Sequence, residues 1–438
     1  MAGDRSEVSA FAVVLLVGVL AAGLARFAGY PPCMSDELNW AAIAGRVAAG
    51  DIWPISGPLH FQATSGLVET TEWPASTVLA VMGVVSVPVA LAVVWWAYGL
   101  MGIAWRWPLF VVLATTSYFW APLLESRPQQ WGQALFLLGT AVLLRAMRAE
   151  SSNAARWWLG WLLIAVLVCL VHLLSFLLLL LVAISAAVSA WLFDRRRTAH
   201  WRGPTVALVV GVTIILAPAG PYEAMVRDVS QNHLVWSLSR TALLFALAVV
   251  AAVVALSFVN WGLPTFSRKA TDDGRTRVPG AYSGGWVTPL VLAGAASLLL
   301  AQAYLLPNAA WSPYGGSVGL FAAIQLGNLC LLVLIARGVG TLSSRQTAAF
   351  ALKDHALLTL LTTLAIVLSV AGLWSSMILI DKNWFLRTLN YSVLLLAPVA
   401  LLGLPRAMSV RSLQLLGTVL AVLSFTAAVR PAWLFSCP

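Results

Sequence analysis

The sequence predicts an all-α polytopic membrane protein, and three observations lead to that class. Hydrophobic residues make up 61% of the 438-residue chain and charged residues only 10%, whereas soluble domains carry about 25% charged residues. The mean hydropathy is +0.89. Apolar runs of about 20 residues, enough to cross a hydrocarbon core about 30 Å thick, recur along the whole chain. The net charge of +10 therefore reflects membrane topology rather than a domain that binds nucleic acid.

The apolar runs divide into about thirteen predicted transmembrane helices. The first run has the position of a signal peptide, but it is long and the remainder is equally apolar, so we expect an uncleaved span. The stretch 157–193 would be about 55 Å long as one helix, which is too long, so we expect two spans with a tight turn near His172–Ser175. The predicted spans are 9–30, 77–104, 108–124, 129–149, 157–171, 174–193, 204–220, 241–262, 286–306, 318–336, 356–380, 391–405 and 413–429.

The charges between these spans give the predicted orientation. Most Lys and Arg residues gather in the loops on one side, which the positive-inside rule makes the cytoplasmic side. We therefore expect an inner N-terminus and an outer C-terminus. Acidic residues contribute little to orientation, yet Asp36, Glu37 and Glu125 all fall in outer loops. Their placement points to function rather than to topology.

Three segments describe the predicted organisation of this single integral membrane domain. An N-terminal membrane module covers residues 1–263 and includes the longest non-spanning stretch, the first outer loop at 31–76. A polar cytoplasmic loop follows at 264–284. The remaining transmembrane helices occupy 285–438. No feature of the sequence predicts an oligomeric state.

The first outer loop carries a predicted surface helix. Pro31-Pro32 end the first span, and Ser35 or Asp36 can cap a helix from about Glu37 to Ala49. This segment is mostly apolar, so we expect it to lie along the membrane interface.

Three acidic residues, in two outer loops, are candidate catalytic residues. Asp36 and Glu37 begin the surface helix, and Glu125 lies at the outer end of the third span, just before Arg127-Pro128. A carboxylate at the water–lipid boundary can accept a proton as a general base, and a charge so close to hydrocarbon normally pairs or serves a site. Two alternatives stay open: the first pair only stabilises the start of its helix, and Glu125 only forms an ion pair with Arg127.

The order and sidedness of these motifs resemble the GT-C class of polytopic glycosyltransferases, which use polyprenyl-phosphate sugars. The resemblance covers roughly residues 9–150 and includes the stretch from Gly57-Pro58 to His60. It implies that Asp36 is the catalytic base, with Glu37 as the adjacent candidate and Glu125 as the acid of the second outer loop. The short outer loops depart from many members of the class, which leaves the acceptor open.

The implied reaction moves a sugar from a polyprenyl-phosphate donor to a cell-envelope glycan or lipid acceptor on the extracytoplasmic face. It needs a base for the acceptor hydroxyl and cations for the departing phosphate. Headgroup binding or local ion pairing is the alternative role for each outer cation. The candidate substrate-binding residues are Arg127, His60, Arg227, His233, Arg240, Lys382 and Arg387.

No cofactor is expected. Outer histidines and acids could together hold a divalent cation, but no closely spaced ligand motif supports a metal site. Two other functions stay open. A transporter or lipid flippase would carry polar residues within its spans, and another envelope glycan polymerase or ligase would use a diphosphate-linked oligosaccharide. Cys33 and Cys437 are both predicted outside, where a disulfide between them is allowed.

Overall fold

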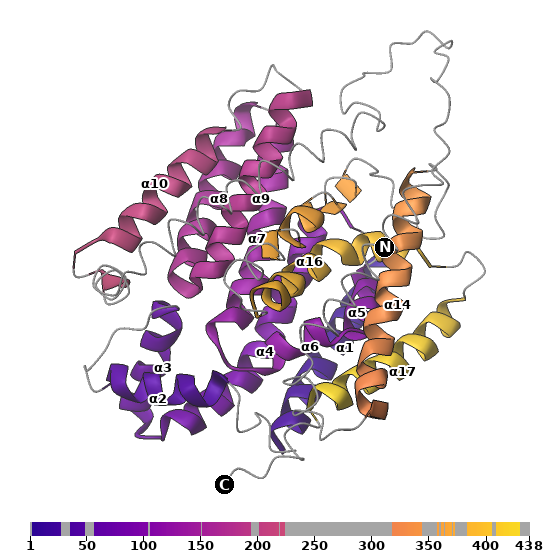
Figure 1. Cartoon of the computed structure of the whole chain (residues 1–438), viewed down its shortest axis with the longest axis horizontal. Helices are drawn as coiled ribbons and strands as arrows, with labels where there is room; N and C mark the ends of the chain where they lie inside the picture. The colour runs from indigo at the N-terminus through magenta and orange to yellow at the C-terminus, as the bar shows by residue number, and fades with distance from the viewer. Residues whose placement is uncertain are drawn as a thin grey trace.

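The computed structural model is helical, with no strand in the residues that it describes, which confirms the predicted all-α class. Figure 1 shows the arrangement of the helices. The described residues are 2–27, 36–48, 57–103, 106–149, 151–193, 201–218, 220–223, 318–343, short pieces between 357 and 372, 383–404 and 409–429. The helices are α1 (Ala2–Phe27), α2 (Asp36–Ala48), α3 (Pro58–Thr71), α4 (Ala75–Leu100), α5 (Arg106–Ala114), α6 (Ser117–Leu124), α7 (Pro128–Arg148), α8 (Ser151–Val171), α9 (Leu173–Phe193), α10 (Arg202–Leu216), α14 (Val318–Ser343), α16 (Asn383–Leu402) and α17 (Val410–Val429).

Three of the described helical segments are long and apolar enough to cross a membrane. They are Glu7–Phe27 within α1, Ala75–Leu100, which is α4, and Asn153–Val171 within α8. A fourth crossing is added if α5 and α6 count as one bent span. The described helices therefore include several that fit a bilayer, as the composition predicts.

The predicted span 108–124 is not one straight helix, because α5 and α6 meet at an angle of 105°. Thr116 caps the start of α6, where its Oγ1 accepts a hydrogen bond of 3.3 Å from the backbone N–H of Tyr118. The same hydroxyl donates to Oδ1 of Asn328 in α14 at 2.7 Å. Apolar composition is similar on both sides of the break, so composition alone predicts a single crossing.

The stretch 157–193 forms two helices, as predicted, and the tight turn between them is confirmed. α8 ends at Val171 and α9 begins at Leu173. His172 lies between them, and its Nδ1 accepts a hydrogen bond of 3.3 Å from the backbone N–H of Ser175. The side chain of His172 thereby satisfies one of the free N–H groups at the start of α9.

Some predicted segments lie outside the described residues. These are the spans 241–262 and 286–306 and the cytoplasmic loop 264–284, while the span 356–380 is described only in short pieces. The division of the chain into two parts at this loop stays a prediction.

The first predicted outer loop contains two helices rather than one. α2 confirms the helix expected from Glu37 to Ala49 within a residue at each end. α3 was not expected, although Pro58 at its first position is typical of a helix start. The two helices pack together: the rings of Trp40 and Phe61 lie 4.9 Å apart, and Oγ of Ser65 donates to the backbone oxygen of Ala44 at 3.3 Å. α2 is therefore covered by α3 on one face.

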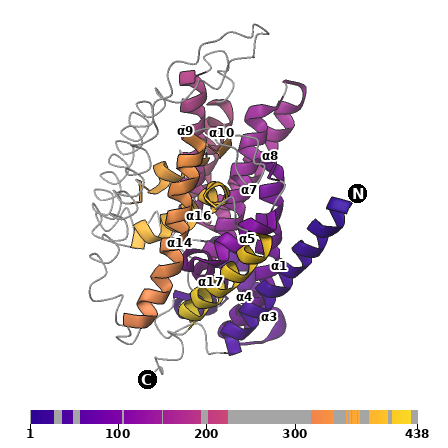
Figure 2. The ribbon, with the colours of Figure 1, turned by 90° about the vertical axis from the view of Figure 1, so that its right-hand side faces the viewer.

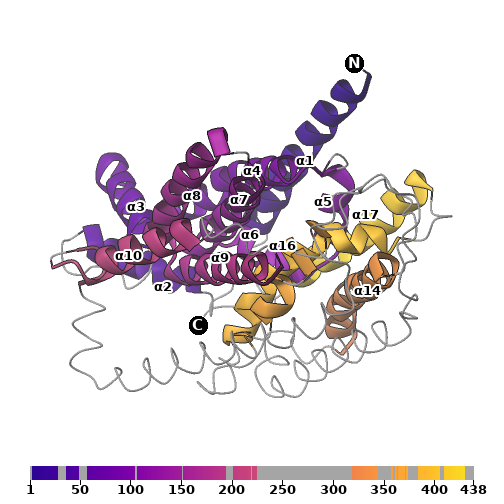
Figure 3. The same cartoon turned by 90° about the horizontal axis from the view of Figure 1, so that it is seen from above.

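α7 lies at the centre of the helix bundle, against α4, α8 and α9, and Figures 2 and 3 show it surrounded by these helices. Nearly all of its side chains are buried. Because protein rather than lipid surrounds α7, its first two turns can hold Gln129, Gln130 and Gln133. α7 is not among the three described helices that are long and apolar enough to cross a membrane. Polar side chains inside a helical bundle normally serve a polar site.

Candidate functional site

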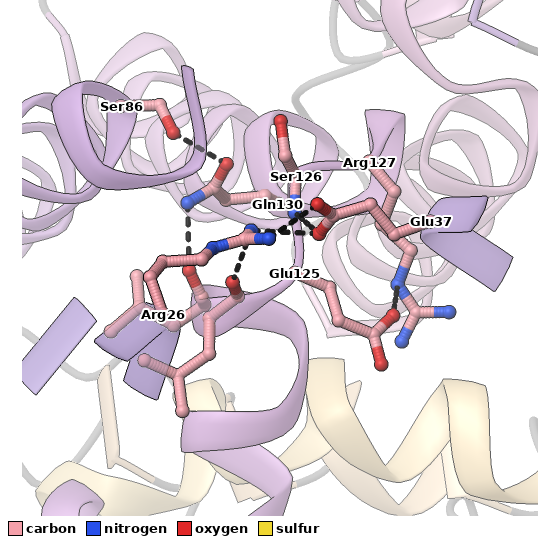
Figure 4. A network of polar contacts seen from close by, with 9 residues as sticks. Arg26, Glu37, Ser86, Glu125, Ser126, Arg127 and Gln130 are labelled. Atoms are coloured by element: carbon pink, nitrogen blue, oxygen red, sulfur yellow. Dashed lines mark hydrogen bonds and ion pairs between the residues drawn. The ribbon is translucent and has the colours of Figure 1, made fainter. Parts of the chain in front are cut away.

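The end of α1 and the start of α2 are joined by a buried ion pair between Arg26 and Glu37. Nη1 of Arg26 lies 2.5 Å from Oε1 of Glu37, and Nη2 lies 2.8 Å from Oε2. The side chains are 13% and 4% exposed. Glu37 Oε2 also accepts a hydrogen bond of 2.7 Å from the backbone N–H of Ser126. We call these three residues the clamp, since they join α1, α2 and the α6–α7 turn (Figure 4).

The sequence provides the space for this clamp at Gly83. The guanidinium of Arg26 crosses α4 at this residue, and a Cβ on Gly83 would overlap Nη2 of Arg26. Arg26 Nη2 also donates to the backbone oxygen of Leu124 at 3.2 Å, which satisfies a carbonyl at the end of α6. Glu37 lies in the first turn of α2, where the helix dipole favours a negative charge.

A second ion pair lies on the other side of Ser126. Nε of Arg127 lies 2.6 Å from Oε2 of Glu125, and these side chains are 16% and 13% exposed. The turn that carries them is closed by a backbone hydrogen bond of 2.9 Å from Arg127 to Glu125. The ion pair considered as the alternative role of Glu125 is therefore present. Figure 4 shows both ion pairs around this turn.

The structure brings part of the predicted catalytic set together. Glu37 contacts the turn that carries Glu125, although 89 positions separate Glu37 from Ser126. Asp36 is the first residue of α2 and directly precedes Glu37, so its backbone lies beside this turn. The side chain of Asp36 is outside the described part of the structure.

Glutamines from α7 extend this polar region into the bundle. Gln130 is fully engaged: Oε1 accepts from Oγ of Ser86 at 2.7 Å, and Nε2 donates to the backbone oxygen of Leu123 at 2.7 Å. Gln129 and Gln133 are 4% and 9% exposed, and their Nε2 atoms have no hydrogen-bond partner among the described residues. Buried polar groups without partners are rare in folded proteins, so these two amides are available to a bound polar molecule.

A third polar group surrounds His172. Its Nδ1 lies 2.7 Å from Oγ of Ser175, which lies 2.6 Å from the hydroxyl of Tyr391 in α16. Gly132 makes this approach feasible, because a Cβ there would overlap Oγ of Ser175. Burial first, and then the charges of Arg387, Arg127 and His60 in that order, lower the pKa of His172 to about 3.

We call His60, Arg127, His172, Arg387 and Tyr391 the His172 cluster. Its members come from α3, the start of α7, the α8–α9 turn and α16. Burial lowers the pKa of His60 to about 4, and Nε2 of its ring is buried without a hydrogen-bond partner in the described part of the chain. Arg387, Arg127 and the N-terminal ends of α7 and α9 bring positive charge to this region, although Glu125 offsets part of the charge of Arg127. Helix N-termini of this kind bind anions.

Several predicted site residues cannot be placed in this way, because they lie outside the described residues. They are Arg227, His233, Arg240 and Lys382, together with the cysteines Cys33 and Cys437. Among the residues that are described, no group of three or more His, Cys, Asp or Glu side chains is arranged to hold a metal ion.

Sequence reasoning missed several residues of the site. Neither Arg26 nor the three glutamines of α7 is among the predicted site residues. A signal for the glutamines was present, since they occupy the first two turns of an otherwise apolar segment. The links from Ser126 to Glu37 and from Ser175 to Tyr391 had no local signal, because they depend on tertiary structure.

Comparisons with known proteins add no relative. No protein-family model, curated protein or solved structure matches the chain. The fold and the site together define an all-helical protein with several apolar helices that fit a membrane and a charged, partly buried site where those helices end.

Proposed function

We propose that this protein is a membrane glycosyltransferase of the GT-C type. It transfers a sugar from a polyprenyl-phosphate donor to a cell-envelope glycan or lipid acceptor on the extracytoplasmic face. The observation that supports this most is the contact of 2.7 Å between Glu37 and Ser126. Through this contact the start of α2, where Asp36 lies, adjoins the turn that holds Glu125 and Arg127.

The topology belongs to the same proposal. About thirteen transmembrane helices, with the N-terminus in the cytoplasm, put the clamp and the His172 cluster at the extracytoplasmic surface. The distribution of basic residues along the sequence supports this orientation. A lipid-linked sugar carries its phosphate at the bilayer surface, which is the depth expected for residues at the ends of apolar helices.

In the proposed mechanism Asp36 takes the proton of the acceptor hydroxyl. The oxygen of that hydroxyl attacks the anomeric carbon, a new carbon–oxygen bond forms, and the bond from the sugar to phosphate breaks. The phosphate leaves with the electron pair, and cations stabilise its charge. Arg127, Arg387 and His60 lie in the positive region around His172 and are the proposed phosphate-binding residues.

Glu37 receives a different role in this mechanism. Both of its oxygens are engaged, Oε1 by Arg26 and Oε2 by Arg26 and Ser126. These donors occupy both carboxylate oxygens, whereas a general base needs an oxygen that the acceptor hydroxyl can reach. Glu37 is therefore a positioning residue that holds Asp36 beside Glu125.

The experiment that tests the proposal is a transfer assay with purified protein in detergent. The donors are polyprenyl-monophosphate pentoses and hexoses, with a diphosphate-linked oligosaccharide as the competing donor class. Asp36→Asn should lower turnover by about 10²–10⁴-fold, the usual contribution of a general base. Glu69→Gln is the matched control, since Glu69 is an exposed carboxylate of α3.

Two outcomes would contradict the proposal. Near-normal turnover of Asp36→Asn, with an unchanged unfolding temperature, would remove Asp36 as the base. Transfer from the diphosphate-linked donor alone would assign the protein to the other class of envelope enzyme.

A further inference from the structure

An apolar groove of about 970 Å³ runs along α1. α5, α6 and α17 form its other walls, and residues of α1 line it from Glu7 to Leu24. At 1.5 Å per residue, that part of α1 is about 26 Å long. Pockets for small molecules have volumes of about 300–1,000 Å³, so this groove can hold a large ligand. In Figure 2, α17 runs beside α1 at this edge of the bundle.

One end of the groove is polar, and the other lies close to the charged site. At one end Glu7 pairs with Arg106, whose Nε lies 3.1 Å from Oε2 of Glu7. At the other end the lining residues Leu24 and Leu123 lie next to the site in sequence, two positions before Arg26 and one before Leu124. We call this the clamp end. A long apolar channel that opens beside a charged site fits a molecule with a hydrocarbon chain and an anionic head.

The length of the groove favours a polyprenyl lipid over a phospholipid. A hydrocarbon core is about 30 Å thick, so one leaflet accounts for about half of that. An acyl chain of a phospholipid enters from one leaflet and would fill only part of a groove about 26 Å long. A polyprenyl chain is long enough to fill it from end to end. Aromatic side chains in the walls, among them Trp107, Phe110 and Trp120, provide flat apolar surfaces against which such a chain can pack.

We propose that this groove holds the hydrocarbon chain of a long polyprenyl phosphate, with the phosphate at the clamp end. This inference rests on the proposed function for the identity of the headgroup. What it adds is the location of the lipid's hydrocarbon chain. Val13, Val17 and Leu20 of α1 are each more than half exposed although they line the groove. In the proposed complex these side chains contact the polyprenyl hydrocarbon chain rather than the protein core.

The test measures binding rather than transfer. The probes are undecaprenyl monophosphate, which has eleven isoprene units, and farnesyl monophosphate, which has three, both without sugar. Each is titrated against the full-length protein in detergent. Val17→Trp fills the groove, and Val85→Trp is the matched control, because Val85 is an equally apolar side chain of α4 that is 61% exposed and does not line the groove.

Val17→Trp should weaken binding of the long probe by about tenfold or more, because several buried isoprene units lose their contacts. Binding of the short probe should change by less than about twofold. Val85→Trp should bind both probes as the unaltered protein does. Arg127→Ala should weaken the binding of both probes, because Arg127 is proposed to bind the phosphate group that both of them carry.

Four results would overturn the assignment. They are unchanged binding of the long probe by Val17→Trp, equal losses for the two probes, equal competition by a phospholipid, and no saturable binding by the unaltered protein. The third result would assign the groove to ordinary membrane lipid. Failure of the proposed glycosyl transfer is distinguishable from these, because the probes carry no sugar and the readout is binding alone.

Discussion

Arg26 and Glu37 form a two-point ion pair at the end of α1, with nitrogen–oxygen distances of 2.5 and 2.8 Å. The pair fixes the start of α2 against α1, and the hydrogen bond from Ser126 fixes the same carboxylate against the α6–α7 turn. A planar guanidinium matches a carboxylate at two points, so this geometry restrains orientation as well as distance. The position of Asp36 beside the Glu125 turn depends on it.

Breaking the clamp should destabilise the fold. Glu37→Gln leaves Arg26 with a buried, uncompensated charge, and removal of one partner from a buried pair costs about 3–5 kcal/mol. Arg26 is 13% exposed, so we expect about 2–4 kcal/mol. The measurement is thermal unfolding in detergent.

A double-mutant cycle measures the interaction energy between Arg26 and Glu37 separately from their contacts with other groups. Arg26→Met with Glu37→Met should cost less than the sum of the single changes, with a coupling energy of about 1–3 kcal/mol. Arg46→Met with Glu69→Met is the matched control, because both side chains are exposed and exposed substitutions usually change stability by less than about 0.5 kcal/mol. Additive effects at Arg26 and Glu37 would show that the pair does not hold the site together.

The stability of the protein should fall in mild acid. His172, whose pKa is lowered to about 3, contributes to that fall, and a separate part comes from His60. Burial lowers its pKa from 6.5 to about 4 in the folded state, so the unfolded chain binds a proton at a higher pH than the folded chain does. Its contribution is therefore fully present above pH 6.5 and is lost as the pH falls toward 4. The loss amounts to about 3 kcal/mol for a shift of this size.

His60→Gln should flatten that dependence. Unfolding temperatures recorded between about pH 7.5 and 5 should fall steeply for the unaltered protein and less for the variant. His200→Gln, which changes a histidine in a predicted cytoplasmic loop, should keep the full slope. Equal slopes for all three proteins would contradict the burial of a neutral His60.

Local sequence patterns predicted the features that depend on neighbouring residues. The helix at 36–48 follows from a capping position and an apolar segment, and the turn at His172 follows from the length of 157–193 and the charges around it. The pair of Glu125 with Arg127 lies within three residues, so it too was predictable. In each case the interacting groups are close in sequence, and backbone geometry restricts their arrangement.

Other features depend on tertiary contacts that the sequence does not reveal. Arg26 meets Glu37 because α1 and α2 both pack against α4, where Gly83 leaves room for the guanidinium. Ser175 meets Tyr391 across 216 positions. The break at Thr116 depends on a cap that also contacts Asn328 of α14. α3 was missed because only one helix, ending near Ala49, was predicted in the first outer loop, although α3 buries His60 and Phe61.

Removing the charge of Glu125 should strengthen donor binding at Arg127 but lower turnover. The carboxylate of Glu125 lies 2.6 Å from Arg127 and neutralises much of its charge. Glu125→Gln removes that charge, so Arg127 should attract a phosphate more strongly, and KM for the polyprenyl-phosphate sugar should fall by about 3–10-fold. If Glu125 also orients the acceptor, kcat should fall by about tenfold or more.

Steady-state kinetics with varied donor concentration separates the two effects, and Glu69→Gln should leave both constants unchanged. Arg127→Lys supplies the complementary change, because it keeps the charge but loses the planar fork that binds phosphate at two points. It should raise KM for the donor. A higher KM in Glu125→Gln, with kcat unchanged, would mean that Glu125 holds Arg127 in its binding position, and the ion pair would then be part of the phosphate site rather than its competitor.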